Sequence, residues 1–355
     1  MLYREAGQFK TSYDADQQIF PIVQDRVFVI AVVLAAFLIV PLFASQYLYT
    51  EILIPFLILS LAAVGLNILV GYCGQVSLGT GGFMAVGAYA AYNLWLRVPE
   101  VNNLIVVFLF GGLMAAAVGI LFGIPSLRIK GFYLAVATLA SQFFLDWLFA
   151  RVKWLTNYTP SGSVAVGETS VFGWKIDTPA ERYLFVLAFV VVATLVAKNL
   201  VRGHIGRSWM AIRDMDIAAE IIGFRPLRTK LSAFAVSSFF IGIAGAMWAF
   251  LRLGAWEPLA FDINRSFQLL FMVIIGGLGS LLGSFLGAAF IILVPIVLNQ
   301  LPGWLGIKMS VALIGHLEFM VFGAMIVFFL IVEPHGLARL WAVAKEKLRL
   351  WPFPH

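Results

Sequence analysis

The amino-acid sequence predicts an all-α, polytopic membrane protein of about ten spans. The chain has 355 residues, of which 62% are hydrophobic and 12% are charged. A soluble domain is on average about 45–50% apolar and about 25% charged, so this chain has too few charged side chains to cover a soluble protein of its size. Ten spans of roughly 20 residues would use about 200 residues and leave about 155 for connections, which the length allows.

The same composition excludes several other classes of protein. Disordered chains are poor in aromatic residues, whereas 15% of this chain is aromatic. Cys73 is the only cysteine, so no disulfide can form within the chain. The formal net charge is +6, but the positive residues lie between apolar runs and not in one solvated patch. This distribution is typical of loops that face an anionic membrane surface, and it does not indicate nucleic-acid binding.

Ten candidate spans follow one another along the chain. They cover residues 27–44, 51–71, 82–97, 104–124, 131–149, 183–199, 231–250, 267–280, 284–298 and 316–332. The N-terminal residues lack the apolar core of a signal peptide, so the first span is predicted to stay in the membrane. The chain then divides into an N-terminal segment 1–26, a membrane domain 27–333 and a C-terminal tail 334–355.

The positions of Lys and Arg predict the orientation, because short cytoplasmic loops are enriched in these residues. Three groups of Lys and Arg lie at residues 128–130, 198–230 and 339–349. If each span crosses the membrane once, all three groups lie on the same side. We therefore expect both termini and the segment 201–228 in the cytoplasm. The segment 150–182 is then external, and its Trp and Tyr residues suit the membrane interface.

Ten spans can form a five-plus-five arrangement, in which the odd number per half makes the halves antiparallel, as in the inverted repeats of many transporters. Gly-rich stretches at 71–82 and 276–280 predict that the third and eighth spans are broken. Broken spans at matching positions are the best sequence indication of a solute site near the membrane midplane. The alternative is that these glycines only let helices pack closely.

Uncharged polar residues and glycines in and beside these breaks form the candidate translocation path. They are Asn67, Gln75, Ser77, Gly79, Thr80, Gly276, Gly277 and Ser280. Such groups suit a neutral or zwitterionic solute, or they bond one helix to another. Ionisable residues are rare in the predicted spans and lie near span ends, where charged side chains reach the interface or pair. These residues are Asp146, Arg151, His316 and Glu318.

No catalytic, metal-binding or cofactor-binding motif is visible in the sequence. The four histidines are not spaced as metal ligands, and no second cysteine supports a zinc site. The dipeptide Gly-Lys is absent, so the chain has no Walker motif for ATP. The chain is therefore predicted not to be an enzyme, and energy for active transport must come from an ion gradient or from a partner.

The segment 201–230 is too polar to span the membrane and too regular for a plain loop. Ser208 is expected to begin a short amphipathic helix, which Gly223 and Pro226 end. The apolar residues of this helix would share one face; they are Trp209, Ile212, Ala219 and Ile222. Such a helix either lies on the bilayer surface or docks against a cytoplasmic motor protein.

Four stretches of the chain carry a resemblance to a known family. Ile217–Gly223 is similar to the Glu-Ala-Ala-x-x-x-Gly coupling motif of ABC importer permeases, within a wider match over Gly206–Lys230. The other matching stretches are Gly65–Tyr89, Gly276–Gly287 and Pro334–Leu337. In this order they resemble the permease subunits of branched-chain amino acid (LIV-type) ABC importers, and most closely the longer of the two homologous permeases.

The resemblance implies the other components of an importer. A homologous second permease would complete the path, two cytoplasmic ABC ATPases would bind ATP and Mg²⁺, and a periplasmic binding protein would deliver the solute to a bacterial inner membrane. The chain itself would bind no cofactor. The ATPases would dock on the coupling residues, which are Arg207, Arg213, Asp214, Asp216, Ala218, Ala219, Glu220 and Gly223.

Two departures from the family pattern bear on this prediction. Ile217 stands where the coupling motif has Glu, so docking would use nearby acidic residues or shape. The external loop has Thr159–Ser163 in place of a Thr-Gly-Gly-like stretch, and some relatives carry urea, short amides or aromatic acids. Two other classes stay open: an ion-coupled carrier or channel, and a membrane enzyme that uses His316 and Glu318. The second is disfavoured because residues two apart do not share a helix face.

Overall fold

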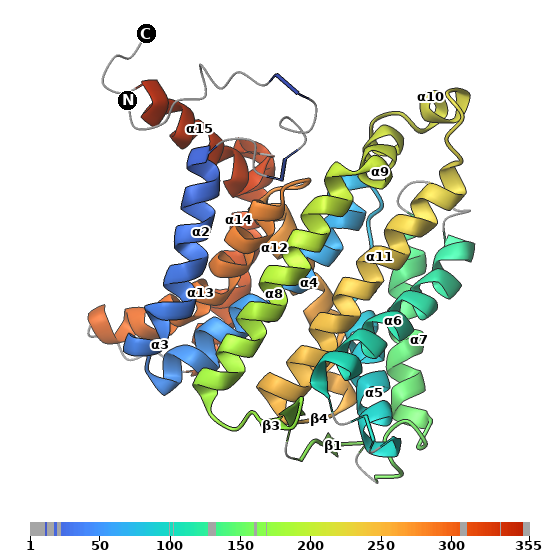
Figure 1. Cartoon of the computed structure of the whole chain (residues 1–355), viewed down its shortest axis with the longest axis vertical. Coiled ribbons are helices and arrows are strands. Elements are labelled where there is room, and N and C mark those ends of the chain that lie inside the picture. The colour runs from blue at the N-terminus through green and yellow to red at the C-terminus, as the bar shows by residue number, and fades with distance from the viewer. Residues whose placement is uncertain are drawn as a thin grey trace.

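The computed structural model describes residues 11–12, 18–19, 23–98, 100–101, 103–126, 133–159, 162–167, 169–305, 311–333 and 335–350. Most of these residues are helical, and the few strands are two residues long. By length and composition, eight helices in the described part of the chain can cross a membrane. The prediction of an all-α, polytopic membrane protein is therefore confirmed (Figure 1).

Helical segments occupy the positions of all ten predicted spans. In the first half they are α2 (Val23–Leu38) with α3 (Val40–Phe43); α4 (Ile54–Asn67), flanked by the π-helical turns η1 (Leu48–Leu53) and η2 (Ile68–Tyr72); α5 (Thr80–Arg97); α6 (Leu104–Ser126); and α7 (Tyr133–Arg151). In the second half they are α8 (Pro179–Arg202); α11 (Pro226–Met247) with the π-helical turn η3 (Trp248–Leu253); α12 (Ile263–Gly276); α13 (Leu281–Leu305); and α14 (Val311–Val332).

Shorter elements connect or follow these spans. The connection from α8 to α11 contains α9 (His204–Asp214) and α10 (Asp216–Ile221), and α15 (Gly336–Leu350) follows α14. A 3₁₀ turn, η4 (Pro258–Phe261), precedes α12. Strand β1 (Val164–Ala165) pairs antiparallel with β4 (Ala255–Trp256), and β2 (Ser170–Val171) pairs with β3 (Trp174–Lys175).

The order of elements repeats in the two halves. Helices α4 and α11 each end in a π-helical turn, and each is followed by a stretch without α-helix, at 73–79 and at 254–262. The next helices, α5 and α12, have 18 and 14 residues, and a longer helix follows each of them. The breaks therefore lie at the starts of the third and eighth spans, which agrees with a five-plus-five arrangement.

The sequence located the first break correctly but not the second. The stretch 276–280 lies after α12, where Gly277 (φ +120°) and Gly279 (φ +73°) turn the chain into α13. Positive φ angles favour glycine, so this Gly-rich stretch marks a tight turn. The actual break at 254–262 contains one glycine, Gly254, beside bulky residues, and it therefore gave no Gly-rich signal.

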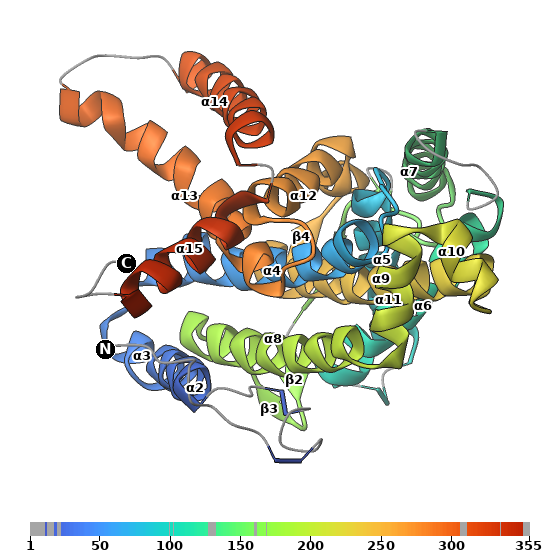
Figure 2. The same cartoon turned by 90° about the horizontal axis from the view of Figure 1, so that it is seen from above.

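Helices α4 and α11 form the centre of the bundle. With their π-helical turns, each has 83% of its most apolar stretch buried, against 28–39% for α6, α7, α8, α12 and α13. From above, α8 and α12–α14 lie on opposite sides of α4 (Figure 2). Helix α5 packs so closely on α11 that a Cβ atom on Gly87 would lie 2.1 Å from the carbonyl oxygen of Gly242. This contact of two helix backbones requires glycine.

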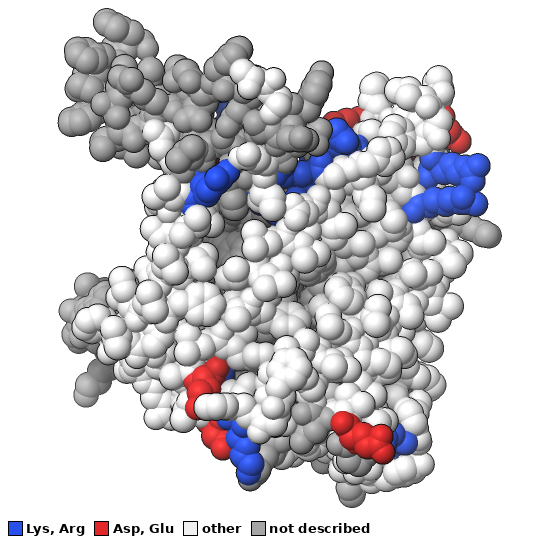
Figure 3. All heavy atoms as spheres, in the orientation of Figure 1, with Lys and Arg blue, Asp and Glu red and all other residues white. Residues whose placement is uncertain are grey.

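Charged side chains gather at the two ends of the bundle and leave an apolar belt between them (Figure 3). One end carries α9, α10, α15 and the start of α2, where the Lys345 ammonium lies 3.0 Å from the Asp25 carboxylate (Figure 1). The four short strands lie at the opposite end. Because the basic segment 198–230 includes α9 and α10, we call their end the cytoplasmic end and the other the external end. Residues 128–130 lie outside the described residues.

Gly87→Ala should lower the stability of the protein by about 1–3 kcal/mol, because the added Cβ atom forces two helix backbones apart. The matched control is Gly323→Ala in α14, where a Cβ atom would meet no other atom within 4 Å. This control should be neutral or stabilising by up to about 1 kcal/mol, since Ala is the better helix former. The measurement is the thermal unfolding midpoint in detergent, and equal midpoints for the two variants would contradict the close packing.

Candidate functional site

The starts of α5 and α12 meet inside the bundle. The Gly81 backbone N–H donates to Ser266 Oγ at 2.7 Å. A Cβ atom on Gly81 would lie 2.7 Å from the carbonyl oxygens of both Phe261 and Asp262. The positive end of the helix dipole lies at a helix N-terminus, so two such termini together favour hydrogen-bond acceptors and an anionic group.

Gln142 of α7 joins these two helix starts. Its side-chain oxygen accepts hydrogen bonds from the Gly82 N–H and, at 3.0 Å, from Ser266 Oγ. Its side-chain nitrogen donates to the Phe261 carbonyl and to Asp146 Oδ1, both at 3.0 Å. Gln142 is fully buried, so one amide satisfies polar groups from α5, α7 and the approach to α12.

A second polar contact fixes the extended stretch 73–79 to α7. The Leu78 N–H donates to Thr138 Oγ1 at 2.9 Å. A Cβ atom on Gly79 would lie 2.6 Å from the Thr138 carbonyl oxygen. Ser77 and Thr80, on either side of this part of the chain, are buried. Thr80 Oγ1 has no hydrogen-bond partner among the described residues. These residues therefore belong to the packed start of α5.

Cavities lie on both sides of this junction. A cavity of 680 Å³ opens toward α9 and α10 and is lined by residues from the stretch 73–78, by Arg213, Asp216 and Lys230, and by Phe267. On the external side, a cavity of 570 Å³ is lined by Asp262, Arg265 and again Phe267. The junction of α5, α7 and α12 thus separates an internal from an external cavity.

Charged side chains also line the cavities on the external side of the junction. A neighbouring cavity of 290 Å³ is lined by Asp146, Lys153, Glu257 and Asp262. Arg265 is held in place, since its guanidinium carbon lies 4.5 Å from the centre of the Trp248 ring and its Nη1 donates to Gln268 Oε1 at 2.7 Å. The external cavities therefore present both carboxylates and cations next to the helix N-termini.

Asn67 forms a separate junction near the cytoplasmic end. Its side-chain nitrogen donates to the Ser280 carbonyl at 2.8 Å and to Ser284 Oγ at 2.9 Å, and its oxygen accepts from the Gly279 N–H at 2.9 Å. Asn67 is fully buried. It therefore holds the end of α4 to the turn between α12 and α13, as a bond between helices and not as a cavity wall.

The connection between α8 and α11 differs from the single helix that the sequence predicted. It forms two helices, because Met215 has an extended backbone (φ −155°, ψ 95°) between α9 and α10. Ser208 lies inside α9, where its Oγ donates to the Ile205 carbonyl at 2.6 Å, so the prediction that it caps the helix was wrong. Gly223 (φ +106°) does end α10, and Pro226 begins α11.

The apolar residues of this connection also do not share one face. Trp209, Ile212 and Ala219 are buried, and Trp209 Nε1 donates to Ser232 Oγ on α11 at 2.9 Å. In contrast, α10 and its flanks expose four large apolar side chains by 70–82%: Met215, Ile217, Ile221 and Ile222. The placement of Ile222 on the buried face was therefore wrong, and α10 presents an apolar surface to its surroundings.

Arg213 links this connection to the membrane domain. Its Nη1 donates to the Gly71 carbonyl at 2.9 Å, and its Nη2 lies 2.8 Å from the Asp214 carboxylate. A Cβ atom on Gly279 would lie 3.3 Å from Arg213 Nη1. Arg213 therefore contacts the end of η2 and lies beside the turn after α12.

The structure distributes the candidate path residues over three places, and the coupling residues lie in a fourth, at α9 and α10. Among the path candidates, Gln75 lines the internal cavity, Ser77, Gly79 and Thr80 lie at the start of α5, and Asn67, Gly276, Gly277 and Ser280 lie at the cytoplasmic junction. Among the coupling candidates, Ala219 is buried, Ala218 is half-buried, and Arg207, Glu220 and Gly223 are exposed. Lys230 lies 3.7 Å from the Asp216 carboxylate.

Gln142 and Ser266 are central residues that were not predicted from the sequence. Gln142 was visible as a polar residue inside the fifth predicted span, but Ser266 preceded the expected start of the eighth span. Cys73 is fully buried, so it is not accessible as a nucleophile. His316 is exposed on α14, and the Glu318 side chain lies outside the described residues.

The amino-acid sequence of the chain matches a known family of permeases. The sequence profile of the permease component of branched-chain amino acid transport systems matches residues 48–330. The high-affinity branched-chain amino acid transport system permease protein LivM of Escherichia coli K12 is 33% identical over 260 residues, which are 64% of this chain and 58% of that protein. The match thus spans little more than half of that relative.

Two more distant relatives extend the comparison. The probable branched-chain amino acid transport permease protein LivM of Methanocaldococcus jannaschii is 24% identical over 82% of this chain and 93% of that protein. The autoinducer 2 import system permease protein LsrC of Enterobacter sp. strain 638 is 27% identical over 65% of each chain. No solved structure matches the chain.

Gln142→Leu should lower the stability by at least about 1–3 kcal/mol, because the buried Gly82 N–H and Phe261 carbonyl lose their partner while the side-chain volume is nearly kept. Ser141→Ala is the control, since Ser141 Oγ donates only within its own helix, to the Thr138 carbonyl. We expect that variant to lose about 1 kcal/mol or less. Thermal unfolding in detergent checks both, and an unchanged Gln142→Leu midpoint would remove Gln142 from the centre of the junction.

Proposed function

We propose that this chain, which belongs to the family of permease components of branched-chain amino acid transport systems, forms one half of the solute path of an ATP-driven importer. A homologous second permease would supply the other half, and a periplasmic binding protein would deliver the solute at the external end. ATP and Mg²⁺ would bind to two partner ATPases and not to this chain. The observation that carries the proposal is the junction of two helix N-termini between an external and an internal cavity.

The geometry of this junction supports an amino acid as the solute. The side-chain oxygens of Gln142 and Ser266 accept hydrogen bonds from the first N–H groups of α5, as the carboxylate of an amino acid would. Asp146, Glu257 and Asp262 in the external cavities suit its ammonium group. Branched-chain amino acids are therefore our first assignment, and urea or short amides, which lack the carboxylate, fit less well.

The exposed face of α10 supports docking of the ATPases. Large apolar side chains that are 70–82% exposed outside the apolar belt are costly in water, so they indicate a protein interface. Ile217, which replaces the Glu of the coupling motif, is part of this surface. At this position the ATPase would therefore bind through shape complementarity and apolar contact and not through an acidic side chain.

Arg213 supports a direct route from the docking surface to the path. It lies near the end of α9, two residues before Met215, the extended link to α10, and its side chain donates to the Gly71 carbonyl. A shift of α10 would therefore change the position of η2, which leads into the stretch 73–79 and the start of α5. This contact would connect ATPase movement to the junction between the two cavities.

Uptake by the reconstituted complex tests the transport proposal. Liposomes containing this chain, its partner permease and both ATPases should take up labelled leucine only with internal ATP and with the binding protein outside. Excess isoleucine or valine should compete, and urea should not. Competition by urea or aromatic acids alone would replace the solute assignment. Uptake by this chain alone under an ion gradient would instead establish a secondary carrier.

Ile221→Glu should lower ATPase recovery in a pull-down about tenfold or more, because a charge would be buried in the apolar docking contact. Ile221 is 82% exposed, so the isolated chain should stay folded. Leu340→Glu on α15 is the control at the same end, where the side chain is 47% exposed. Equal ATPase recovery for both variants would contradict the proposed docking surface.

Arg213→Ala should keep the ATPases bound but reduce ATP-driven uptake about tenfold or more, because a charge-assisted hydrogen bond of about 1.5–3 kcal/mol to the membrane domain is lost. Parallel assays of ATPase recovery and leucine uptake separate this outcome from that of Ile221→Glu. Normal uptake by Arg213→Ala would show that coupling takes another route.

A further inference from the structure

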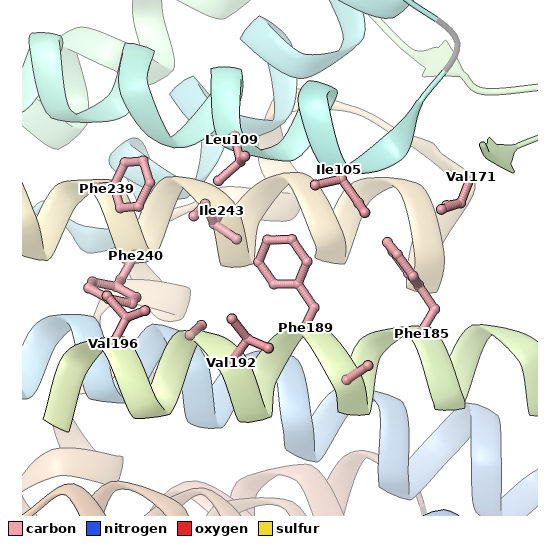
Figure 4. Close-up of a pocket in the computed structure, with 12 residues that line it drawn as sticks. Ile105, Leu109, Val171, Phe185, Phe189, Val192, Val196, Phe239, Phe240 and Ile243 are labelled. Carbon is pink, nitrogen blue, oxygen red and sulfur yellow. The ribbon is translucent and has the colours of Figure 1, made fainter. Parts of the chain in front are cut away.

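An apolar groove runs along the outer side of the bundle between α6, α8 and α11 (Figure 4). Phe185, Phe189, Val192 and Val196 of α8 form one wall. Leu109 of α6 lies opposite them, and the floor includes Ile243 of α11. Every lining side chain is aliphatic or aromatic, so the groove can hold only an apolar ligand.

The dimensions of the groove match one lipid chain. Phe185 and Val196 are 11 residues apart on α8, and a helix rises about 1.5 Å per residue, so the wall is about 16 Å long. This is about half of the roughly 30 Å hydrocarbon core of a bilayer, which is the depth of one leaflet. The groove volume is 440 Å³, within the range of about 300–1,000 Å³ for small-molecule sites.

A cation lies at the external mouth of the groove. Arg182 precedes Phe185 by one helical turn and Phe189 by two, so it belongs to the same face of α8. Side chains on a helix lean toward its N-terminus, which directs Arg182 toward the external surface. Its Nε atom is buried and has no hydrogen-bond partner among the described residues. A buried N–H without an acceptor is costly, so an acceptor from a ligand would stabilise it.

The carboxylate that precedes Arg182 in the sequence is already engaged in other contacts. Glu181 is engaged in the cap of α8, where its Oε2 accepts from the Asp177 and Thr178 N–H groups, each at 3.1 Å. The mouth therefore keeps a guanidinium available to an anion, directly above an apolar groove of one leaflet's depth. This combination of a cation and an apolar channel is complementary to a phospholipid with an anionic headgroup.

We propose that this groove is a binding site for one anionic phospholipid of the external leaflet, with its phosphate at Arg182 and one acyl chain between α6 and α8. The site lies on the side of α4 away from α12–α14 (Figure 2), and it is separate from the solute junction. A bound chain would fill the space between α8 and α11 and brace α8, which continues directly into α9 and the coupling connection.

Native mass spectrometry of the purified chain, with phosphatidylglycerol as the probe, tests this site. The wild type should retain one phosphatidylglycerol and should prefer it to phosphatidylcholine. Arg182→Gln should reduce retention about tenfold. Ala188→Phe should also reduce it, because Ala188 is exposed and lines the groove. Arg151→Gln, an exposed arginine at the external end of α7, is the matched control and should retain the lipid.

Each alternative outcome overturns the proposal. Full retention by Ala188→Phe would show that the lipid binds elsewhere, and equal losses in Arg182→Gln and Arg151→Gln would show only a general effect of charge. A photo-crosslinker at Val192, which is 61% exposed, identifies the occupant directly. An adduct of phospholipid mass supports the site, whereas an adduct with a protein would show that the groove is a subunit interface. Size-exclusion chromatography confirms that each variant is folded.

Discussion

The structure depends on the rule that a polar backbone group in apolar surroundings must find its partner within the protein. Helices α5 and α12 begin inside the bundle, so water at the membrane surface cannot accept hydrogen bonds from their first N–H groups. Gln142 and Ser266 accept from the start of α5, and the Asp262 side chain accepts from the Arg265 N–H at the start of α12. Helix α7 must therefore pack against elements from both halves of the chain.

The same rule shapes the cytoplasmic end. Asn67 satisfies groups in the turn between α12 and α13, and Arg213 reaches the Gly71 carbonyl at the end of η2. A Cβ atom on Gly71 would lie 2.2 Å from the Gly279 backbone nitrogen, so the chains touch without a side chain between them. These contacts place Arg213 of α9 beside both the end of η2, before the stretch 73–79, and the turn after α12.

The sequence predicts the structure correctly where the signal is local. Long apolar runs predicted the helices, since each span must be apolar along its own length, and Gly223 predicted the end of α10 from its conformational freedom. It failed where two segments must be compared in space. The glycines at 276–280 looked like a break but form a turn, and the break at 254–262 has no comparable composition. Ile222 matched the helical face of Trp209 only on the assumption of one continuous helix, which Met215 interrupts.

The sequence by itself determined that the chain is an all-α membrane protein, and it predicted about ten spans and a cytoplasmic side for the basic connections. These follow from the hydropathy of consecutive residues and from the count of charges. Only the tertiary structure decided which polar residues meet, because Gln142, Ser266 and the start of α5 are separated by 60 residues or more along the chain. Their contact depends on how the helix backbones pack against one another. The sequence pattern of a single segment does not indicate which distant segment it will contact.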